Sequence, residues 1–346
     1  MAEGWFGPGG YLKEGFSGQV INGYGGAVRW TNNSQGFRND SDFLQTPPEG
    51  VFRILSLGDS FTAGYRVGQE DTYSYLLERW STDSFLPTEV LISCIESPQR
   101  GLNYLQEYGY KWQPHMVLLG ITLGNDIAQD YISLHPETTG FNNGLEKYDI
   151  PGNCLIQHNS IHKLAHSTAK LLRRLHFIRT VFPASVGIVA WYGNTKKPKM
   201  FDACSGLGMF IKNPPGVIEE AYTRHFRVLS EFSRFCKTRN IIFAVLIFPQ
   251  RFQVQARDWT STVRYYALKE DEFDILLPNR RIRQFCEQEG IFLIDPTESM
   301  KKQHQQTKSD FYLPQGDMHW NKHGHHAWFE GAKPSFAPLI RDSLLD

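Results

Sequence analysis

Three short polar stretches carry side chains whose types could act together in nucleophilic catalysis. The tripeptide Gly58-Asp59-Ser60 supplies a hydroxyl, Asn125 an amide, and Asp317 with His319 a carboxylate and an imidazole. An imidazole can accept the proton of a serine hydroxyl, and a carboxylate bonded to its other nitrogen fixes the tautomer that does so. These side chains therefore have the composition of a serine-dependent acyl-transfer site, provided that the fold brings them together.

The turn at Ser60 follows directly on an apolar stretch. Four of the residues at 52–57 are apolar, as in a strand buried on both faces of a parallel sheet, and Gly58-Asp59 then ends that strand. Glycine permits a tight turn, and an aspartate can hydrogen-bond its own backbone there. Open α/β sheets bind ligands at the carboxyl ends of their strands, where Ser60 falls. Alone, the tripeptide predicts only a turn, and the functional interpretation depends on the rest of the chain.

Asn125 and Asp126 follow the third apolar run, at residues 115–121. The right-handed crossover rule places the carboxyl ends of both runs at the same edge of the sheet, so the Asn125 amide is expected near Ser60. Either residue could instead cap the helix predicted to begin at about residue 127. We interpret Asp126 as the cap and Asn125 as a site residue.

Asp317-Met318-His319 lies in a loop before a helix predicted from about 322 to 345. This spacing lets the carboxylate and the imidazole point to one side, so the pair is the predicted base for Ser60. His323, His325 and His326 extend the stretch into a cluster that a metal ion could use. The zinc helix pattern with its glutamate base is absent, and the adjacent His325 and His326 must face different sides of a helix. We therefore predict no metal and no cofactor.

Apolar runs alternate with amphipathic stretches along most of the chain. Further strands are predicted at 89–95, 241–248 and 291–295, and helices at 71–80, 102–112, 217–237 and 279–289. This alternation predicts a three-layer α/β/α, flavodoxin-like fold with a parallel five-stranded sheet. Residues 1–50 are interpreted as a loop-rich lead-in with a short strand at 27–31. The domain at 51–346 then holds a helical and loop insertion at about 133–215.

The composition argues against several classes of protein. The 346 residues are 41% hydrophobic and 21% charged, so disorder is not indicated. Lys+Arg and Asp+Glu number 36 each, which argues against nucleic acid or an anionic membrane surface as the main partner. No apolar run is long enough to span a bilayer, and no signal peptide is visible at the N-terminus. The compartment and the oligomeric state stay open.

A few other residues allow more than one interpretation. The five cysteines are widely spaced and are predicted to be free buried thiols, although Cys154 and Cys204 could pair in an exported protein. Gln250 and Arg251 follow the predicted strand at 241–248 and are expected to line a pocket. Arg38 is expected to form a surface or structural ion pair rather than to reach the site.

The three stretches, in this order, resemble the motifs of the SGNH (GDSL-type) hydrolase family. Gly58-Asp59-Ser60-Phe61 resembles its first block, Gly124-Asn125-Asp126 its third, and Asp317 with His319 its last. The resemblance runs from about residue 32 to the C-terminus, interrupted at 133–215. It implies that Ser60 is the nucleophile, His319 the base and acid, and Asp317 the orienting carboxylate. It also implies that the Ser60 N–H and the Asn125 side chain hold the oxyanion.

The sequence departs from the family pattern at two places. The second block places a glycine after the second strand, and here Gly101 is a displaced candidate for that oxyanion donor. The acid and base are spaced as Asp-x-His, which resembles the branch containing polysaccharide O-acetyltransferases and related esterases.

We therefore predict a serine ester hydrolase that forms an acyl-serine intermediate on small acyl esters, with O-acetyl groups of carbohydrates as candidates. The alternatives are O-acyl transfer to a sugar hydroxyl and a catalytically silent binding protein with the same fold.

Overall fold

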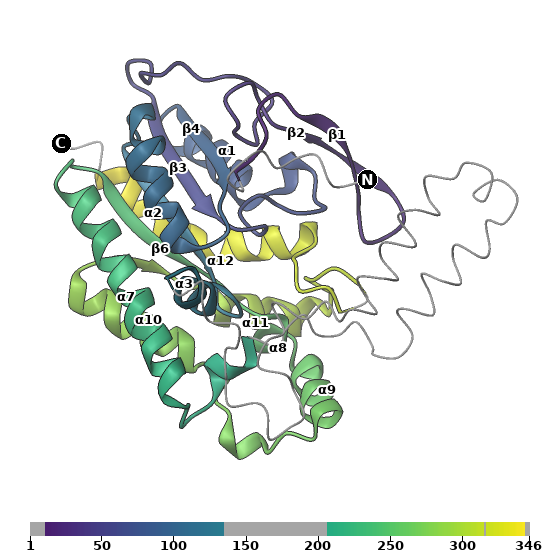
Figure 1. Ribbon diagram of the computed structural model, residues 1–346. Helices are drawn as coiled ribbons and strands as arrows, with labels where there is room; N and C mark the ends of the chain where they lie inside the picture. Colours follow the sequence, from purple (N-terminus) through teal and green to yellow (C-terminus); the bar gives the residue numbers. More distant parts are fainter. Residues whose placement is uncertain (1–10, 135–205, 315, 343–346) are drawn as a thin grey trace, which may run out of the picture.

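A five-stranded parallel sheet forms the centre of the computed structural model, which describes residues 11–134, 206–314 and 316–342 (Figure 1). Its strands are β3 (Phe52–Gly58), β4 (Thr88–Cys94), β5 (Met116–Thr122), β6 (Ile242–Phe248) and β7 (Phe292–Ile294). They lie in the order β4-β3-β5-β6-β7, and every neighbouring pair is parallel. This is the flavodoxin-like order, so the predicted fold class is confirmed.

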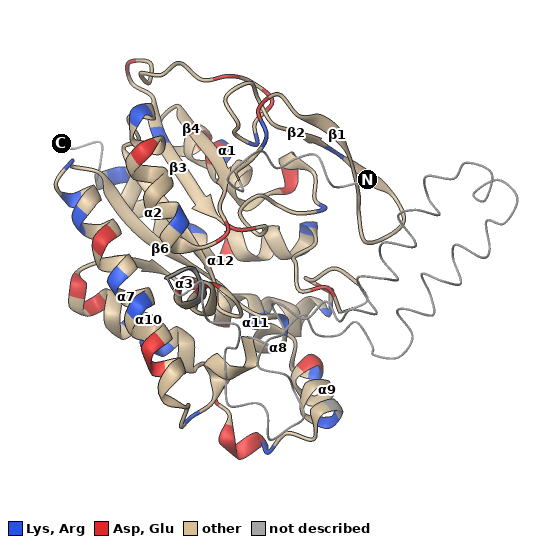
Figure 2. Ribbon diagram, viewed as in Figure 1, with Lys and Arg blue, Asp and Glu red and all other residues tan. Residues whose placement is uncertain are grey.

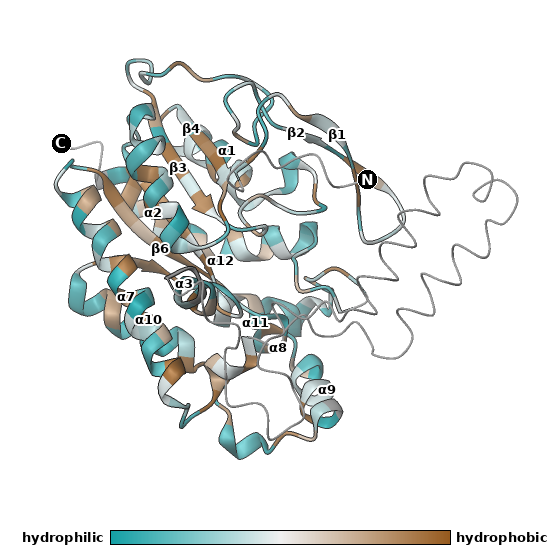
Figure 3. Ribbon diagram, in the orientation of Figure 1, coloured by the Kyte–Doolittle hydropathy of each residue, from teal (hydrophilic) through white to brown (hydrophobic). Residues whose placement is uncertain are grey.

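Helices cover both faces of the sheet, which explains why its central strands are apolar on both sides. One face packs against α2 (Pro98–Glu107), α3 (Asp126–Leu134), α7 (Gly216–Lys237) and α10 (Leu277–Glu289). The other face packs against α1 (Tyr73–Ser84), α11 (Thr297–Thr307) and α12 (Lys322–Asp342). Figure 3 shows the result as brown strands between helices that carry hydrophilic residues along their length.

The remaining elements are short and lie around this three-layer core. They are the strands β1 (Ser17–Ile21) and β2 (Ala27–Thr31), the helices α8 (Arg251–Val254) and α9 (Ala256–Tyr266), and the 3-10 turns η2 (Gln69–Asp71), η3 (Gly109–Trp112), η5 (Gly206–Phe210) and η6 (Glu270–Glu272). The strand predicted at 27–31 is confirmed as β2, which pairs with β1 as an antiparallel hairpin. The elements β1, α8, α9 and α11 were not predicted from the sequence. Most of the insertion predicted at 133–215 lies outside the described residues.

Local sequence explains where several helices begin and end. The Thr72 hydroxyl accepts a hydrogen bond from the Tyr75 N–H and caps α1, and the preceding Asp71 contacts His326. Pro98 occupies the first turn of α2, where its missing N–H costs nothing. Gly290 ends α10 in the left-handed conformation that glycine adopts without strain.

Charged residues of both signs alternate along the outer helices (Figure 2). On α7 and α10 several of them pair, including Arg281 with Glu219 and Arg224 with Glu220. Within the described ranges, no helix combines the length and the apolar character needed to cross a bilayer.

A buried carboxyl group beside the edge strand makes stability depend on pH. Glu78 of α1 accepts a hydrogen bond of 2.7 Å from the Val90 N–H of β4. Burial and, to a smaller extent, the nearby Glu89 raise the pKa of Glu78 to about 7, and the hydrogen bond from the Val90 N–H opposes that rise. Because the folded carboxyl holds its proton more tightly than the unfolded one, stability falls as the pH rises from about 4.5 to about 7.

Glu78→Gln should therefore raise the free energy of unfolding at pH 8 by about 1–2 kcal/mol and change it little at pH 5. The Gln side chain still offers an oxygen to the Val90 N–H but carries no charge to bury. Urea denaturation at the two pH values measures the effect. An equal change at both pH values would contradict it.

Candidate active site

The predicted site residues lie at the point where the order of strands reverses. Ser60 follows β3 and Asn125 follows β5, and these two strands pair directly from Ile54↔Met116 to Leu57↔Leu119. In this order of strands, the crevice outside the carboxyl ends of the first and third strands is the usual ligand-binding place. The expectation that Ser60 and Asn125 share one edge of the sheet is therefore met.

Ser60, His319 and Asp317 form one hydrogen-bonded chain. The Ser60 Oγ lies 2.7 Å from Nε2 of His319, and Nδ1 of His319 lies 2.6 Å from Oδ1 of Asp317. The same Asp317 oxygen also accepts a bond of 3.0 Å from the His319 backbone N–H. With Nδ1–H donating to the carboxylate, Nε2 is left as an acceptor facing the hydroxyl, which is the arrangement in which an imidazole can take the serine proton.

The loop that carries Asp317 and His319 is closed at its base. Tyr312 and Trp320 form an antiparallel bridge, and the Leu313 N–H donates to the His319 carbonyl at 2.8 Å. Trp320 packs edge-on against Phe61, which directly follows the nucleophile candidate, with ring centroids 4.9 Å apart. The two segments that carry the candidate site residues are therefore joined by aromatic packing as well as by the Ser60–His319 contact.

Arg251 holds the same loop from the end of β6. Its Nη1 donates to the carbonyls of Asp317 at 2.8 Å and Leu313 at 3.3 Å, and its Nε donates to Asp258 at 3.1 Å. Arg251, expected from the sequence to line a pocket, thus anchors this loop. Gln250 is buried at 2% exposure, with its side chain against Gly124.

Asp59 and Asn125 fill the space beside Ser60. The Asp59 carboxylate accepts a hydrogen bond of 2.9 Å from the Phe61 N–H and so shapes the turn. Burial raises the pKa of Asp59, and the Phe61 N–H and the polar side chains of Thr122 and Asn125 oppose that rise. Asn125 thus lies next to the residue that precedes Ser60. Within the part of the chain that the structure describes, its buried Oδ1 has no hydrogen-bond partner.

The sharp turn after β3 depends on two glycines. A Cβ added to Gly58 or to Gly120 would collide with the Thr62 hydroxyl, and one on Gly120 would also strike the ring of Phe248. This space lets the Thr62 hydroxyl reach the Tyr73 hydroxyl at 2.9 Å. The segment after Ser60 can therefore pack directly onto the sheet.

Gly101, the displaced candidate for an oxyanion donor, does not lie in the site. It belongs to α2, and its N–H donates to the Ser97 carbonyl at 2.9 Å. A Cβ at this position would strike Ile95 and lie 3.4 Å from Phe232. Glycine is needed here for close packing of α2 against its neighbours, and its N–H is already occupied, so its assignment to the oxyanion hole was wrong.

Asp126 does not act as the expected cap. It is the first residue of α3, and its carboxylate accepts the Thr122 N–H at 2.7 Å across the turn after β5. Burial raises its pKa well above the usual range, and Asp59 and Asp130 raise it further. Behind it, Asp130 meets the fully buried His225 of α7 at 2.7 Å. These contacts tie the turn that carries Asn125 to the helices beneath it.

Arg38, expected at the surface or in an ion pair, is fully buried and holds the loop after Ser60. Its guanidinium donates to the carbonyls of Ala63, of Gly64 at 2.7 Å and of Val67 at 2.5 Å. It also lies 3.9 Å above the ring of Trp30 on β2. Gly64 has a φ of +64°, and a Cβ there would crowd Arg38 and Thr72. Burial lowers the pKa of Arg38.

The C-terminal histidines have separate surroundings. His325 is buried, accepts the Tyr73 N–H at 3.4 Å on Nδ1, and burial lowers its pKa to about 3. His326 is exposed and lies 3.0 Å from Asp71, so the two adjacent imidazoles face different sides of α12 as predicted. Across the ranges that the structure describes, His, Cys, Asp and Glu nowhere gather in a group of three or more that could hold a metal ion. Cys94, Cys236 and Cys286 are free and buried, as expected.

Comparisons with known proteins give likenesses of structure alone. No family model matches the chain, and no curated protein matches it. The chain is similar to the crystal structure of TesA (12% identity, TM-score 0.42, 83% of this chain and 99% of that one). It is also similar to a catalytic mutant of an acetylxylan esterase from Geobacillus stearothermophilus (9%, 0.42, 83% and 94%) and to an extracellular lipase from Streptomyces rimosus (10%, 0.38, 82% and 99%). At these values the likeness does not bear on the activity of this chain.

The anchoring position of Arg251 predicts that its substitution affects stability and the reactivity of Ser60 more than substitution of Arg257 does. Arg251→Gln leaves two carbonyls without their donor and Asp258 without its cation, although Gln255 still donates to that carboxylate at 2.8 Å. We therefore expect it to cost about 1–3 kcal/mol of stability and to slow labelling of Ser60 by a fluorophosphonate at least tenfold.

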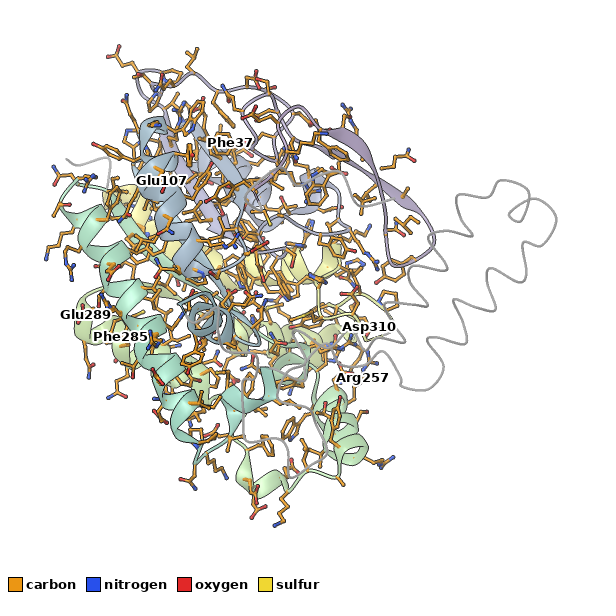
Figure 4. The ribbon with its side chains drawn as sticks, in the orientation of Figure 1. Phe37, Glu107, Arg257, Phe285, Glu289 and Asp310 are labelled. Atoms are coloured by element: carbon orange, nitrogen blue, oxygen red, sulfur yellow. The ribbon has the colours of Figure 1, made fainter. Side chains whose placement is uncertain are left out.

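Arg257→Gln on α9 is the matched control. Figure 4 shows Arg257 beside Asp310 at the edge of the molecule, and this pair is more than half exposed, so its loss should cost less than about 0.5 kcal/mol. Equal effects of the two substitutions on labelling would contradict the anchoring role.

Proposed function

We propose that the protein is a serine ester hydrolase that acts through an acyl-serine intermediate. The observation that carries the proposal is the Ser60–His319–Asp317 chain, with contacts of 2.7 and 2.6 Å at the carboxyl edge of the sheet. A hydroxyl, an imidazole and a carboxylate in this order can activate the serine for attack on an acyl carbon. The resemblance of the three motifs to the SGNH hydrolases supports the same chemistry.

The first half of the reaction transfers the acyl group to the enzyme. The Ser60 Oγ attacks the ester carbonyl carbon while its proton passes to Nε2 of His319, and Asp317 stabilises the imidazolium that forms. In the proposal, the Ser60 N–H and the Asn125 side chain donate to the oxyanion. Within the described residues the Ser60 N–H has no other partner. The tetrahedral intermediate collapses as the C–O bond of the leaving alcohol breaks and the alcohol oxygen takes the proton from His319.

The second half returns the free enzyme. His319 accepts a proton from water, the resulting hydroxide attacks the acyl carbon, and the bond to Ser60 Oγ breaks as that oxygen regains a proton from His319. The products are a carboxylic acid and the original alcohol. A sugar hydroxyl in place of water would give O-acyl transfer, which is the second candidate, favoured by the Asp-x-His spacing. Small acyl esters, with O-acetyl groups of carbohydrates among them, are the proposed substrates.

Hydrolysis of p-nitrophenyl acetate by the wild type and by Ser60→Ala tests the proposal. We expect turnover that a chelator does not reduce and that falls by at least about 10³-fold in the variant, because the nucleophile is lost. Turnover that survives in Ser60→Ala would refute the serine mechanism. A wild type that neither hydrolyses the ester nor reacts with a fluorophosphonate would favour a catalytically silent binding protein.

Asn125→Ala separates the oxyanion role from a structural one. If the side chain donates to the oxyanion, kcat should fall about 10²–10³-fold with little change in KM, because that bond strengthens only in the transition state. The thermal midpoint should fall by no more than about 3 °C, since among the described residues the Asn125 Oδ1 has no partner and the contact of its side chain with Asp59 is the interaction that is lost. A fall in kcat of less than threefold would remove Asn125 from the proposed site.

A further inference from the structure

One arginine beside the candidate site is held in a backbone conformation that favours glycine. Within the described ranges five residues other than glycine have a positive φ, and four of them lie at helix ends, where this conformation terminates a helix: Gln113, Asn240, Ala267 and Lys308. The fifth, Arg66, has a φ of +63° and lies in the loop after Ser60. Strain of this kind persists where the surroundings enforce it, and it concentrates at functional sites.

The surroundings of Arg66 enforce its position. Arg38 holds the carbonyls of Gly64 and Val67, which flank the segment of Tyr65 and Arg66 on both sides. The Arg66 guanidinium packs 4.9 Å from the ring of Tyr65, and that ring lies 4.8 Å from the ring of His319. The loop therefore presents its two central side chains to the acid–base pair.

Arg66 contacts the oxygen of Asp317 that His319 does not use. Its Nη1 lies 3.4 Å from Oδ2 of Asp317, whereas both contacts from His319 fall on Oδ1. The Arg66 side chain is a third exposed, at 33%, and that of Asp317 is 22% exposed, so the contact is partly buried. A carboxylate held through both oxygens has less freedom to rotate away from the imidazole, and the cation favours its charged form.

We propose that Arg66 is a positioning residue that locks Asp317 onto His319 and keeps the pair working at lower pH than it otherwise would. This inference rests on the proposed function. A positive charge beside the pair disfavours a second positive charge on the imidazole, so His319 stays available as a base further into acid. Glycine at position 66 would relieve the backbone strain but would supply no charge.

Other titratable and charged groups also lie near the Asp317–His319 pair and contribute to the electrostatic environment in which Arg66 acts. Asp59 interacts with His319 from the turn after β3, and the buried His325 interacts with it from α12. Arg251 donates to the backbone carbonyl of Asp317 and not to its carboxylate. Among the described residues Arg66 is thus the cation that contacts the Asp317 side chain.

The pH profile of kcat/KM for p-nitrophenyl acetate tests the proposal in Arg66→Gln, Arg66→Lys and Arg66→Gly. We expect the acid limb to move up by about 0.5–1 pH unit in the Gln and Gly variants, the size of effect of one charge a few ångströms away in a partly exposed site. Arg66→Lys keeps the positive charge, so its acid limb should lie close to that of the wild type. Arg66→Gly should stay within about 2 °C of the wild-type thermal midpoint, because glycine adopts this φ without cost.

Lys308→Gly is the matched control, since Lys308 is also a cation at positive φ, with φ +57°, at the end of α11. Its pH profile should superimpose on that of the wild type. If the acid limb does not move in Arg66→Gln, the proposal is overturned, whether or not kcat or the thermal midpoint falls. Arg66 would then have a structural role at most.

A second measurement keeps this test separate from the test of the esterase function. The NMR signal of the His319 ring can be titrated in the wild type and in Arg66→Gln whether or not the protein turns over an ester. We expect its midpoint to rise in the variant by the same 0.5–1 pH unit. An inactive wild type that shows this shift would refute the proposed function alone, whereas equal midpoints would refute the role of Arg66.

Discussion

The hydrogen bond between Ser60 and His319 is the contact on which the site depends, and it joins residues 259 positions apart in the chain. A bond of 2.7 Å tolerates errors of only a few tenths of an ångström, so two separate loops must each be held to that tolerance. The sheet fixes where the loop after Ser60 begins, whereas the loop that carries His319 lies between α11 and α12. Arg38 then holds one loop by its carbonyls, and Arg251 holds the other in the same way. Both arginines act on backbone atoms, which restrains the path of a loop more directly than contacts between side-chain tips would.

Much of the framework could be predicted because it depends on patterns that are local in sequence. Apolar runs identify the strands of a parallel sheet, since such strands are buried on both faces, and polar residues just beyond them fall at the carboxyl edge. This reasoning located Ser60 and Asn125 from their positions relative to the strands. It located His319 less directly, because nothing in the loop at 312–320 indicates a strand. That part of the prediction relied on the chemistry of an Asp and a His two residues apart.

What could not be predicted depends on contacts that only the folded chain makes. Gly101 occurs near the expected place for an oxyanion donor, but its N–H is used by α2 and its missing side chain makes room for Ile95. Arg66 offers no signal in the sequence, because a positive φ is set by the loop around it. In both cases tertiary packing, and not local preference, decides the outcome. Helix α8 was missed because four residues are too few to show a helical period, whereas the eleven residues of α9 carry an amphipathic pattern from which a helix could have been predicted.

The segment around Arg38 shows why the N-terminal region matters for the site. A guanidinium with no exposed surface is costly to bury unless its donors are largely satisfied. Backbone carbonyls from the loop after Ser60 accept from Nη1 and Nη2 of Arg38, the face of Trp30 lies over the guanidinium, and among the described residues Nε has no acceptor. The Arg38 backbone N–H also donates to the Ile92 carbonyl of β4 at 2.9 Å. Removing this segment would leave those carbonyls without their donor and free the loop that presents Tyr65 and Arg66. Residues 30–38 therefore belong structurally with the sheet, although their sequence suggests only a connecting stretch.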